Sequence, residues 1–505
     1  MPVSWWRGHS QTNYLSQIEC ERLSASSSKH GICTGTEIFL IVPSSNTIAP
    51  HRATVAVVGG GVSGLICARR LSQAGVHVTL YESEAMLGGE IRTITFAGHQ
   101  IDMGAEAVHL SAPGMKELVK ELKLSDDLIN SNPGMSWLWT RRGLRRLPAG
   151  VGPSGPSRLG PVLRSGVMSF RGLARAALEP LIPRRPLLGD IGIGDYIGQR
   201  FGRQVVDRFV DPVLGSLHAG NVYALSLRAI TPELSSIAES RASILMRRRG
   251  QRSGPPLSFA TWVGGLSLFV DRLLTETDVE VRKSSPVDSV TSLPGGRFQI
   301  RETSGLTLDV DAVVLALPAR IAAKLIRPVS QNAANLLEQI RFASVATALV
   351  AYPLEAVKGV RAFTGTGLLV PSTNNRLLKA ATFLTTKWSH LADSNYFLMR
   401  LSSGRAGENV IDQLEDAALV AHLHDDLVDA TGITAKPVQY FVQRWPEAIP
   451  QLEIGHVDLV AQVREELDSY PGVMLAGSSY DGLGLATCLR SGERAAVSCL
   501  TLIAH

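Results

Sequence analysis

The stretch Ala-Thr-Val-Ala-Val-Val-Gly-Gly-Gly-Val-Ser-Gly, at residues 53–64, decides the fold of this chain. Its apolar run over 54–58 predicts a buried strand, and the residues after the glycines predict a helix over about 63–74. A second apolar run over 76–81 predicts another strand, which ends at Glu82. A strand, a tight turn, a helix, a second strand and an acid form the βαβ unit that binds dinucleotides, so the expected fold class is α/β.

The glycines of this stretch have separate tasks in a phosphate-binding turn. Gly59 permits the turn, Gly61 lets a pyrophosphate approach the backbone, and Gly64 lets the helix pack against the strand. The start of the helix presents N–H groups to the phosphates, and Glu82 accepts hydrogen bonds from a ribose. The cofactor-binding candidates of this unit are Gly59, Gly60, Gly61, Val62, Ser63, Gly64 and Glu82. The alternative is an ordinary glycine-rich turn followed by an incidental glutamate.

The residues after Glu82 indicate which dinucleotide is bound. They read Ser-Glu-Ala-Met-Leu-Gly-Gly-Glu-Ile-Arg at 83–92, and Ile-Asp-Met-Gly-Ala-Glu-Ala follows at 101–107. Paired glycines let the backbone pass close to a ligand, and Arg92 offers a fork of donors to a phosphate. The pattern resembles the FAD-containing amine oxidase and protoporphyrinogen oxidase superfamily, which implies a tightly held FAD and no nicotinamide cofactor.

This resemblance extends the set of cofactor-binding candidates. The added residues are Ser83, Gly89, Glu90, Arg92, Gly104, Ala105, Glu106 and Ala107. Gly104 to Ala107 would line the flavin on the side opposite the chain's C-terminal glycine turn. The alternative for Arg92 is a solvated surface group, because an exposed arginine commonly has no other role.

Bulk composition bounds the classes of protein to which this chain can belong. A chain of 505 residues with 45% hydrophobic and 19% charged residues can form two or three domains with sizeable cores. Its net charge of +5 fits an anionic substrate or membrane surface without requiring either. Short arginine clusters stand without a recognition module, so nucleic-acid binding is not expected. No metal site is predicted.

Cysteine usage and hydropathy point to the cytoplasm. The five cysteines include no C-x-x-C pair, and a reducing compartment is expected. No apolar run reaches the roughly 18 residues that span a bilayer. Residues 1–51 lack the pattern of a signal peptide, and we expect them to be a flexible N-terminal extension or a product of a start codon assigned too far upstream.

Composition shifts along the chain predict a domain organisation. We assign residues 52–135, 262–325 and 441–505 to a Rossmann-like FAD-binding domain and 326–440 to a substrate-binding domain of the α+β type. Residues 136–261 form a helical insert, with helices over 173–179, 195–201, 205–214 and 232–246. Apolar faces of the insert either contact a membrane surface or pack into a core. The strands at 311–318 and 473–476 should return the chain to the FAD-binding sheet.

Five ordered motifs narrow the resemblance to the oxygen-dependent porphyrinogen oxidases of haem biosynthesis. The matches cover about 52–495. They are DPVLGSLHAG at 211–220, LSLRA at 225–229, WVGGLS at 262–267, RWPEAIPQ with a later Gly-His at 444–456, and AGSSYDGLGLATCLRSG at 476–492. The glycine fingerprint alone would not reach this family level.

The resemblance assigns further cofactor contacts. It implies that Leu483, Gly484 and Leu485 contact the flavin, that Val287 holds the adenine through its backbone, and that Trp445 packs near the cofactor. Independently of it, glycines at 482 and 484 let the backbone approach a flat ring, and the helix that follows can stabilise negative charge there. Trp445 as a plain core residue is the alternative.

Three departures from the family pattern bear on the substrate. Ala486 replaces the usual proline, His218 replaces the usual Tyr or Phe, and Gly152 stands where some members have an arginine that pairs a substrate propionate. The last change puts the propionate contacts in doubt. The motif set favours the tetracarboxylate coproporphyrinogen III over the dicarboxylate protoporphyrinogen IX.

The function implied is the FAD-dependent, six-electron oxidation of coproporphyrinogen III by molecular oxygen, which releases hydrogen peroxide. Protoporphyrinogen IX oxidation is the nearest alternative; a flavin amine oxidase-like enzyme and a binding protein without turnover are others. We name no catalytic acid or base, because aromatisation drives the reaction. His218 and Arg228 are candidates, with a buried core histidine and a structural ion-pair partner as their alternatives. Other enzymes of the haem pathway and a peripheral membrane contact are candidate partners.

Overall fold

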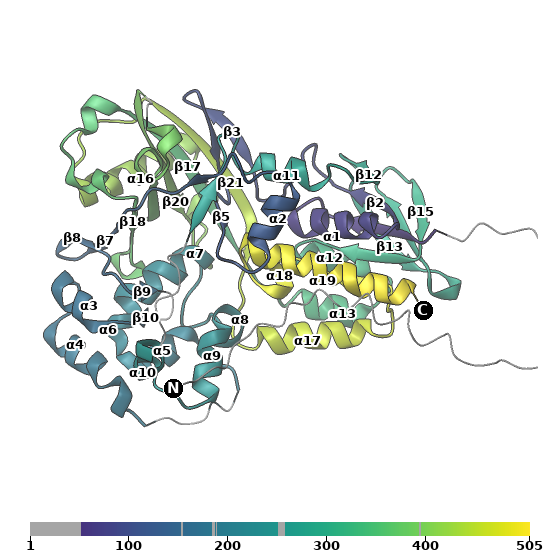
Figure 1. Ribbon diagram of the computed structural model, residues 1–505, viewed down its shortest axis with the longest axis horizontal. Helices are drawn as coiled ribbons and strands as arrows, with labels where there is room; N and C mark the ends of the chain where they lie inside the picture. Colours follow the sequence, from purple (N-terminus) through teal and green to yellow (C-terminus); the bar gives the residue numbers. More distant parts are fainter. Residues whose placement is uncertain are drawn as a thin grey trace, which may run out of the picture. The chain divides into compact units, whose positions relative to one another are not determined.

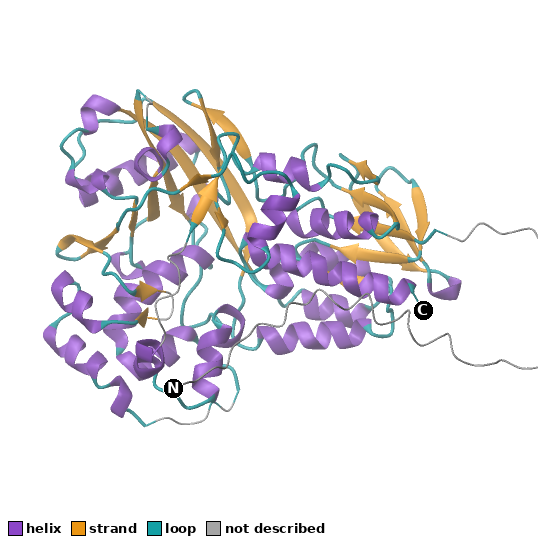
Figure 2. Cartoon of the chain, viewed as in Figure 1, coloured by secondary structure: helices purple, strands orange, loops and turns teal. Residues whose placement is uncertain are grey.

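The computed structural model describes residues 52–152, 155–183, 187, 189–250, 258–392 and 395–504. The predicted N-terminal extension over 1–51 lies outside these residues. Among the described helices, none is long and apolar enough to cross a membrane. The strands fall into two large sheets and four small ones, with helices packed against the large sheets (Figures 1 and 2).

The first large sheet is parallel and confirms the predicted dinucleotide fold. Its strands, in spatial order, are β12 (Val279–Arg282), β2 (His77–Tyr81), β1 (Thr54–Val58), β16 (Ala312–Leu315) and β22 (Val473–Leu475). Strands β16 and β22 return from distant parts of the chain, as predicted. Helices cover both faces, which explains why the central strands β1 and β16 are almost entirely apolar rather than alternating.

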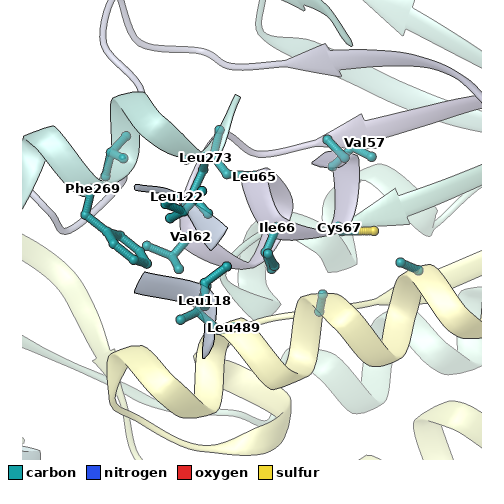
Figure 3. Close-up of a cluster of buried hydrophobic side chains, with 14 of the residues drawn as sticks. Val57, Val62, Leu65, Ile66, Cys67, Leu118, Leu122, Phe269, Leu273 and Leu489 are labelled. Atoms are coloured by element: carbon teal, nitrogen blue, oxygen red, sulfur yellow. The ribbon is translucent and has the colours of Figure 1, made fainter. Parts of the chain in front are cut away.

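Two hydrophobic cores flank this sheet. Along β1, Val55 and Val57 face one core while Ala56 and Val58 face the other. The helices that pack on the two sides are α1 (Val62–Gln73), α2 (Met115–Glu121), α11 (Ser267–Leu273) and α19 (Leu485–Ile503) in the first core, and α12 (Ala319–Ile326), α13 (Gln331–Leu337) and α17 (His456–Leu467) in the second. Figure 3 shows α1 residues of the first core meeting side chains of α2, α11 and α19.

The second large sheet has seven strands and is antiparallel apart from one pair. Its order is β21 (Gln439–Pro450), β17 (Phe342–Pro353), β20 (Tyr396–Ser403), β19 (Leu378–Phe383), β18 (Gly367–Leu369), β7 (Ser136–Thr140) and β8 (Gly143–Arg146). Strands β18 and β7 are parallel. Helices α14 (Leu384–Lys387), α15 (Val410–Gln413) and α16 (Asp416–Thr431) follow its strands, and α16 packs on its apolar face.

Small sheets complete the strand inventory. One of them is the antiparallel meander of β13 (Val287–Ser292), β14 (Phe298–Glu302) and β15 (Thr307–Val310). The other small sheets are β5 (Val108–His109) with β11 (Phe259–Thr261) and β6 (Ile129–Asn130), the pair β3 (Thr93–Phe96) and β4 (His99–Asp102), and the pair β9 (Val151–Gly152) and β10 (Gly155–Pro156).

The region between β10 and β11 is helical, as predicted, but its helix boundaries differ. Its members are α3 (Leu159–Ser165), α4 (Phe170–Ala177), α5 (Ile193–Phe201), α6 (Arg203–Val205), the π-helix η2 (Val206–Gly215), α7 (Ser216–His218), α8 (Leu227–Ile230), α9 (Pro232–Glu239) and α10 (Ile244–Gly250).

Two predictions about these helices were wrong in detail. The helix expected over 205–214 is wound as a π-helix around Pro212, because a proline cannot donate the backbone bond of a regular turn. The helix expected over 232–246 is two helices, separated by a turn in which Arg241 has a φ of 52°. Apart from these breaks, the helices share one core with Leu138 of β7.

Candidate active site

The turn between β1 and α1 has the geometry of a phosphate-binding loop. Gly59 has a φ of 108°, which favours glycine. A Cβ at Gly64 would stand 1.9 Å from the carbonyl oxygen of Gly59, so only glycine lets α1 lie this close to the turn. A Cβ at Gly61 would meet nothing within 4 Å. The space beside Gly61 is therefore open to a ligand, whereas the space beside Gly64 is filled by the protein itself.

The start of α1 is prepared for an anion. Its N-terminal residue Gly61 provides no side-chain cap, and the first turn contains no acidic residue. Uncapped N–H groups and the positive end of the helix dipole favour a phosphate at this position. Arg92 is half-buried, and its guanidinium makes no hydrogen bond or ion pair with any residue in the described ranges. These features fit the pyrophosphate of a dinucleotide.

Glu82 closes the nucleotide end of this turn. Its carboxylate accepts hydrogen bonds from the backbone N–H of Gly60 at 2.8 Å and of Glu84 at 2.9 Å. The Ser83 hydroxyl donates to it at 3.1 Å. The chain leaving β12 lies alongside, because Ser285 donates its N–H to the Glu82 carbonyl oxygen at 2.9 Å. This contact brings Val287, two residues further on, to the same end of the sheet as Glu82.

The predicted glycine pair also lies on the turn. Gly88 donates its N–H to the Gly60 carbonyl oxygen at 2.9 Å and pairs with Gly61 in a parallel bridge. A Cβ at Gly89 would lie 3.3 Å from the Gly61 Cα. The loop over 83–92 thus covers the phosphate turn, and the backbone approaches more closely than side chains would permit.

The C-terminal glycine turn comes to the same place. The Ser63 hydroxyl of α1 donates to the Cys488 carbonyl oxygen of α19 at 2.8 Å. A Cβ at Gly492 would stand 2.1 Å from the Ser63 carbonyl oxygen, so the two helices are in close contact. Figure 3 shows Leu489 of α19 beside Val62 and Ile66 of α1. The turns at 59–64 and 482–485 therefore lie close enough to flank one extended ligand.

The start of α19 resembles the start of α1. Gly484 precedes the helix with a φ of 103° and is exposed, and neither a side-chain cap nor an acidic residue stands in the first turn. A Cβ at Gly484 would meet nothing within 4 Å. Leu483 and Leu485 on either side are half-buried. A second helix terminus is thus open to a group that carries partial negative charge.

A third segment, around Gly104, meets the loop over 83–92. A Cβ at Gly104 would stand 1.9 Å from the Glu90 carbonyl oxygen and 3.5 Å from Cζ2 of Trp445. The Trp445 indole N–H donates to Oγ1 of Thr347 at 3.2 Å, and that hydroxyl donates to the Met103 carbonyl oxygen at 3.1 Å. Trp445 is therefore held in a fixed orientation beside Gly104.

Glu90 lies at this contact, since its carbonyl oxygen faces Gly104. Burial raises the pKa of the Glu90 carboxyl to about 7, because the surrounding protein disfavours its charged form. Glu90, Gly104 and Trp445 therefore adjoin one another beside the loop that covers the phosphate turn.

Glu106 differs from its neighbours because its side chain is already paired. It forms ion pairs with Lys387 and Arg400. Burial would raise the pKa of this carboxyl, but the two cations overcome that effect and bring the pKa to about 2. Arg400 also donates to the carbonyl oxygens of Asp102 and Gly104, at 3.1 and 2.8 Å. The segment Gly104–Ala107 can therefore meet a cofactor with its backbone, while the Glu106 carboxylate holds the segment on the second sheet.

Sequence reasoning missed Arg400, Lys387 and Thr347. All three belong to the second large sheet or to the helix that follows it, and none lies in a recognisable motif. The available signal was the charge of Glu106 in a stretch of small residues, since a buried carboxylate requires a cationic partner. That signal did not say which cation.

The motif at 211–220 also reaches this site. Ala219 has a φ of 47° and packs with Val345 against Trp445. His218 is 6% exposed, and burial lowers its pKa to about 4. Its Nδ1 atom is buried and has no hydrogen-bond partner among the described residues. A buried histidine with a lowered pKa therefore stands next to Ala219.

The other flagged positions are Arg228, Gly152 and Ala486, which lie in an ion pair, a short strand and a helix start. Arg228 forms an ion pair with Asp458 at 2.8 Å, which is the structural alternative we gave for it. Gly152 is half-buried in β9. Ala486 lies in the first turn of α19, where its backbone is helical without the proline that the resemblance led us to expect.

Comparison with known proteins agrees with this geometry. Residues 62–500 match the family described as flavin containing amine oxidoreductase. A curated relative from Mycobacterium tuberculosis, named coproporphyrinogen III oxidase, is 34% identical over 451 residues, which cover 88% of this chain and 96% of the relative. One of the same name from Bacillus subtilis is 28% identical over 467 residues, 89% of this chain and 98% of the relative.

A crystal structure from Exiguobacterium sp. 255-15 superposes with a TM-score of 0.78 at 26% identity. It covers 88% of this chain and 98% of that one, and its name is "putative protoporphyrinogen oxidase". The chain belongs to the flavin-containing amine oxidoreductase family. It is an FAD-dependent oxidoreductase, and the residues around the two glycine turns fit that cofactor.

Proposed function

We propose that this enzyme oxidises coproporphyrinogen III to coproporphyrin III, with molecular oxygen as the electron acceptor and hydrogen peroxide as the second product. The observation that carries the proposal is the position of Trp445, which packs against the cluster containing Ala219 of the 211–220 motif and lies beside Gly104. This shared contact supports a substrate site next to the flavin. The names of the relatives support the tetracarboxylate as the substrate.

FAD, when bound, would accept the hydrogen and electrons removed from the substrate. The residues of the chain would bind and orient it. We propose that the starts of α1 and α19 hold its phosphates and the polar edge of its ring, that Glu82 and Val287 hold the adenosine, and that Trp445 and Gly104 confine the ring. The ion pairs of Glu106 would keep the confining segment rigid, which a precise contact requires.

The twenty predicted cofactor contacts remain a proposal at the level of single residues. Their backbones gather around the two glycine turns and the Gly104 segment, which supports the set. Glu106 would contribute backbone only, since its carboxylate is engaged. No residue is proposed as a catalytic acid or base. His218 would be neutral at pH 7 and would pack beside the substrate rather than transfer a proton.

Protoporphyrinogen IX is the second candidate substrate, and the Exiguobacterium structure favours it. The two substrates differ in charge, because coproporphyrinogen III has four propionates and protoporphyrinogen IX has two. The cationic side chains that contact those propionates would determine which of the two substrates the enzyme prefers.

We also propose that the insert makes the peripheral membrane contact and that the enzyme works in the cytoplasm. The side chains of Phe170 and Leu181 are 84% and 79% exposed on neighbouring elements, and Leu163 is exposed nearby. Arg164, Arg171 and Arg175 belong to the same short helices. Apolar side chains among arginines suit the surface of an anionic bilayer. Sedimentation with anionic vesicles, with Phe170→Ser as the comparison, tests this contact.

The experiment for the main proposal is an aerobic assay of the purified protein with both porphyrinogens in parallel. Porphyrin fluorescence and hydrogen peroxide should rise together, faster with coproporphyrinogen III. The protein should show the visible absorbance of an oxidised flavin. A flavin-containing protein that oxidises neither porphyrinogen would overturn the substrate assignment, and a faster rate with protoporphyrinogen IX would select the second candidate.

A further inference from the structure

Lys379 is a buried cation without a partner. It lies at a bulge in β19, and its residue is only 5% exposed. Its ammonium group makes no hydrogen bond or ion pair with any residue of the described ranges. A lysine buried in this way is costly, because the charge loses its water and gains nothing in exchange. Burial, with a smaller effect of Arg405, lowers the pKa of Lys379 to about 7, against an opposing effect of Glu408.

Arg405 adds a second cation whose hydrogen bonds are incomplete. Its Nη1 donates to the Arg376 carbonyl oxygen at 3.1 Å and lies 3.9 Å from the Glu408 carboxylate. Its Nη2 is buried and has no hydrogen-bond partner in the described part of the chain. Arginine offers a planar fork of donors, so an unused Nη2 is available to an acceptor such as a carboxylate oxygen.

The acidic groups nearby do not neutralise the pair. Glu408 is 40% exposed at its side chain and contacts Arg405 only at the 3.9 Å limit. Burial raises the pKa of the Asp211 carboxyl, although the charge of Arg405 acts to lower it. The Asp211 carboxylate accepts a hydrogen bond from the Ser372 N–H at 2.7 Å. Two largely buried cations thus stand together with donors to spare. An anion that enters this region would find both an opposite charge and hydrogen-bond donors.

The cluster lies where the helical insert meets the second sheet, beside the proposed substrate site. The Ser216 hydroxyl of α7 approaches the Lys379 carbonyl oxygen at 3.4 Å. Ala406, next to Arg405, donates its N–H to the Ala219 carbonyl oxygen at 2.7 Å. Ala219 packs with Val345 against Trp445. The cationic cluster and Trp445 therefore both adjoin the segment that contains Ala219.

We propose that Lys379 and Arg405 form a binding site for a carboxylate of the substrate. They would supply a charge contact to a propionate, whereas Gly152, at the position where some family members have an arginine, supplies none. This inference rests on the proposed function, since it takes the ligand to be a porphyrinogen. The ammonium of Lys379 gives the charge, and Nη2 of Arg405 gives a directed hydrogen bond. A cation kept unpaired until a ligand arrives accounts for the otherwise unfavourable burial of Lys379.

The experiment uses the full-length, FAD-loaded protein and the product coproporphyrin III, whose fluorescence reports binding without turnover. Its uncharged tetramethyl ester, in the same detergent buffer, is the second probe. The wild type should bind the acid at least tenfold more tightly than the ester. Lys379→Met should weaken binding of the acid by about tenfold or more and leave the ester unchanged, because only the acid has a charge to lose.

Thermal unfolding separates a ligand-binding lysine from a structural one. Lys379→Met replaces an unpaired buried charge with an apolar chain of similar length, so its Tm without porphyrin should equal or exceed that of the wild type. Lys324→Met, at an exposed lysine of α12, is the matched control and should change neither binding nor Tm. A structural lysine would instead lower the Tm and weaken acid and ester alike.

The outcomes distinguish the inference from the function on which it rests. If the wild type oxidises coproporphyrinogen III but binds acid and ester equally, the carboxylate site is wrong and the function stands. The carboxylate site is also wrong if Lys379→Met binds the acid within twofold of the wild type. If the wild type neither binds coproporphyrin III nor oxidises its porphyrinogen, the proposed function fails and the inference fails with it.

Discussion

Buried polar groups are paired at the phosphate turn but lack partners at the junction between the helical insert and the second large sheet, which contains Lys379, Arg405 and His218. At the turn, the Gly60 N–H is paired with Glu82, and the Gly60 carbonyl oxygen with the Gly88 N–H. At the junction, Lys379, Nη2 of Arg405 and Nδ1 of His218 are buried without such partners in the described structure. The turn is complete and leaves open space beside Gly61. The junction is incomplete in its polar groups, as expected where a ligand supplies the missing ones.

The insert itself shows that this incompleteness is local. Glu179 is fully buried there, and its carboxylate pairs with Arg200 at 2.6 Å. It also accepts hydrogen bonds from the Ser243 hydroxyl and from the N–H groups of Ile244 and Leu245. A buried charge in this region can therefore be fully partnered when its role is structural. We therefore infer that Glu179 and Lys379 differ in role, and mutation of each residue tests this difference.

The largest expected effect is the loss of that structural pair. Glu179→Gln leaves the Arg200 guanidinium buried without a counter-charge, and removing one partner of a buried pair costs about 3–5 kcal/mol. The free energy of unfolding, measured with urea, should fall by that amount. Lys379→Met is the matched comparison, and its free energy of unfolding should not fall. Equal destabilisation of the two variants would remove the distinction between a partnered and an unpartnered buried charge.

Lowering the pH to about 4 should reduce the free energy of unfolding by about 3 kcal/mol through His218. Burial lowers the pKa of His218 from 6.5 to about 4, so the unfolded chain takes up a proton at a higher pH than the folded protein. The contribution of neutral His218 to the free energy of unfolding is therefore fully present above pH 6.5. It is lost as the pH falls toward 4, by about 1.4 kcal/mol for each pH unit between the two pKa values.

Urea unfolding of His218→Gln between pH 7.5 and 4 checks this effect. The variant should lose about 3 kcal/mol less than the wild type across that range, because no imidazole remains to be protonated. His422→Gln, at an exposed histidine of α16, should follow the wild-type curve. If His218→Gln also follows the wild-type curve, the buried histidine is not neutral in the folded protein.

The same two regions explain what the sequence could predict. The turn is built by residues close together in the chain, and each glycine has a local reason, so β1, α1, β2 and the cofactor class were predictable. The strands at 312–315 and 473–475 were placed in the same sheet because their apolar runs suit a strand covered on both faces. The motif order then indicated the family.

The contacts made by the second large sheet could not be predicted, because their partners are distant in sequence. The pairs of Glu106 with Lys387 and Arg400 join segments almost 300 positions apart, and no spacing rule connects them. Strand β7 lies at the start of the segment assigned to the helical insert, yet it enters the large sheet through a parallel pair with β18. Lys379 belongs to an otherwise ordinary strand, and only its burial reveals it.

Two glycines of the turn provide a sharper test of the open space for the cofactor. Gly61→Ala adds a methyl group that meets no protein atom within 4 Å, at a φ of −72° that alanine accepts. The apo-protein should keep its Tm, while FAD affinity falls by about 100-fold, or about 2.7 kcal/mol, since the methyl group occupies the path of the pyrophosphate. Gly64→Ala should instead lower the Tm of the apo-protein.

Titration of the apo-protein with FAD, followed by flavin fluorescence, measures this effect. Gly160→Ala is the matched control, because its added methyl group also meets nothing within 4 Å but lies in helix α3 of the insert. That variant should bind FAD as the wild type does. Wild-type affinity in Gly61→Ala would mean that the phosphates take another path and that the turn is only structural.

The smallest expected effect belongs to Glu82, where structure and cofactor binding share one carboxylate. Glu82→Gln keeps the shape, but it turns one acceptor into an amide donor that cannot receive an N–H, so one of the bonds from Gly60 and Glu84 is lost. The free energy of unfolding should fall by about 1–2 kcal/mol. Glu84→Gln, at the exposed acid two residues on, should leave it unchanged. If both variants have the same free energy of unfolding, the three hydrogen bonds to Glu82 stabilise the protein no more than hydrogen bonds to water would. The pairing of polar groups at the turn would then have no energetic effect.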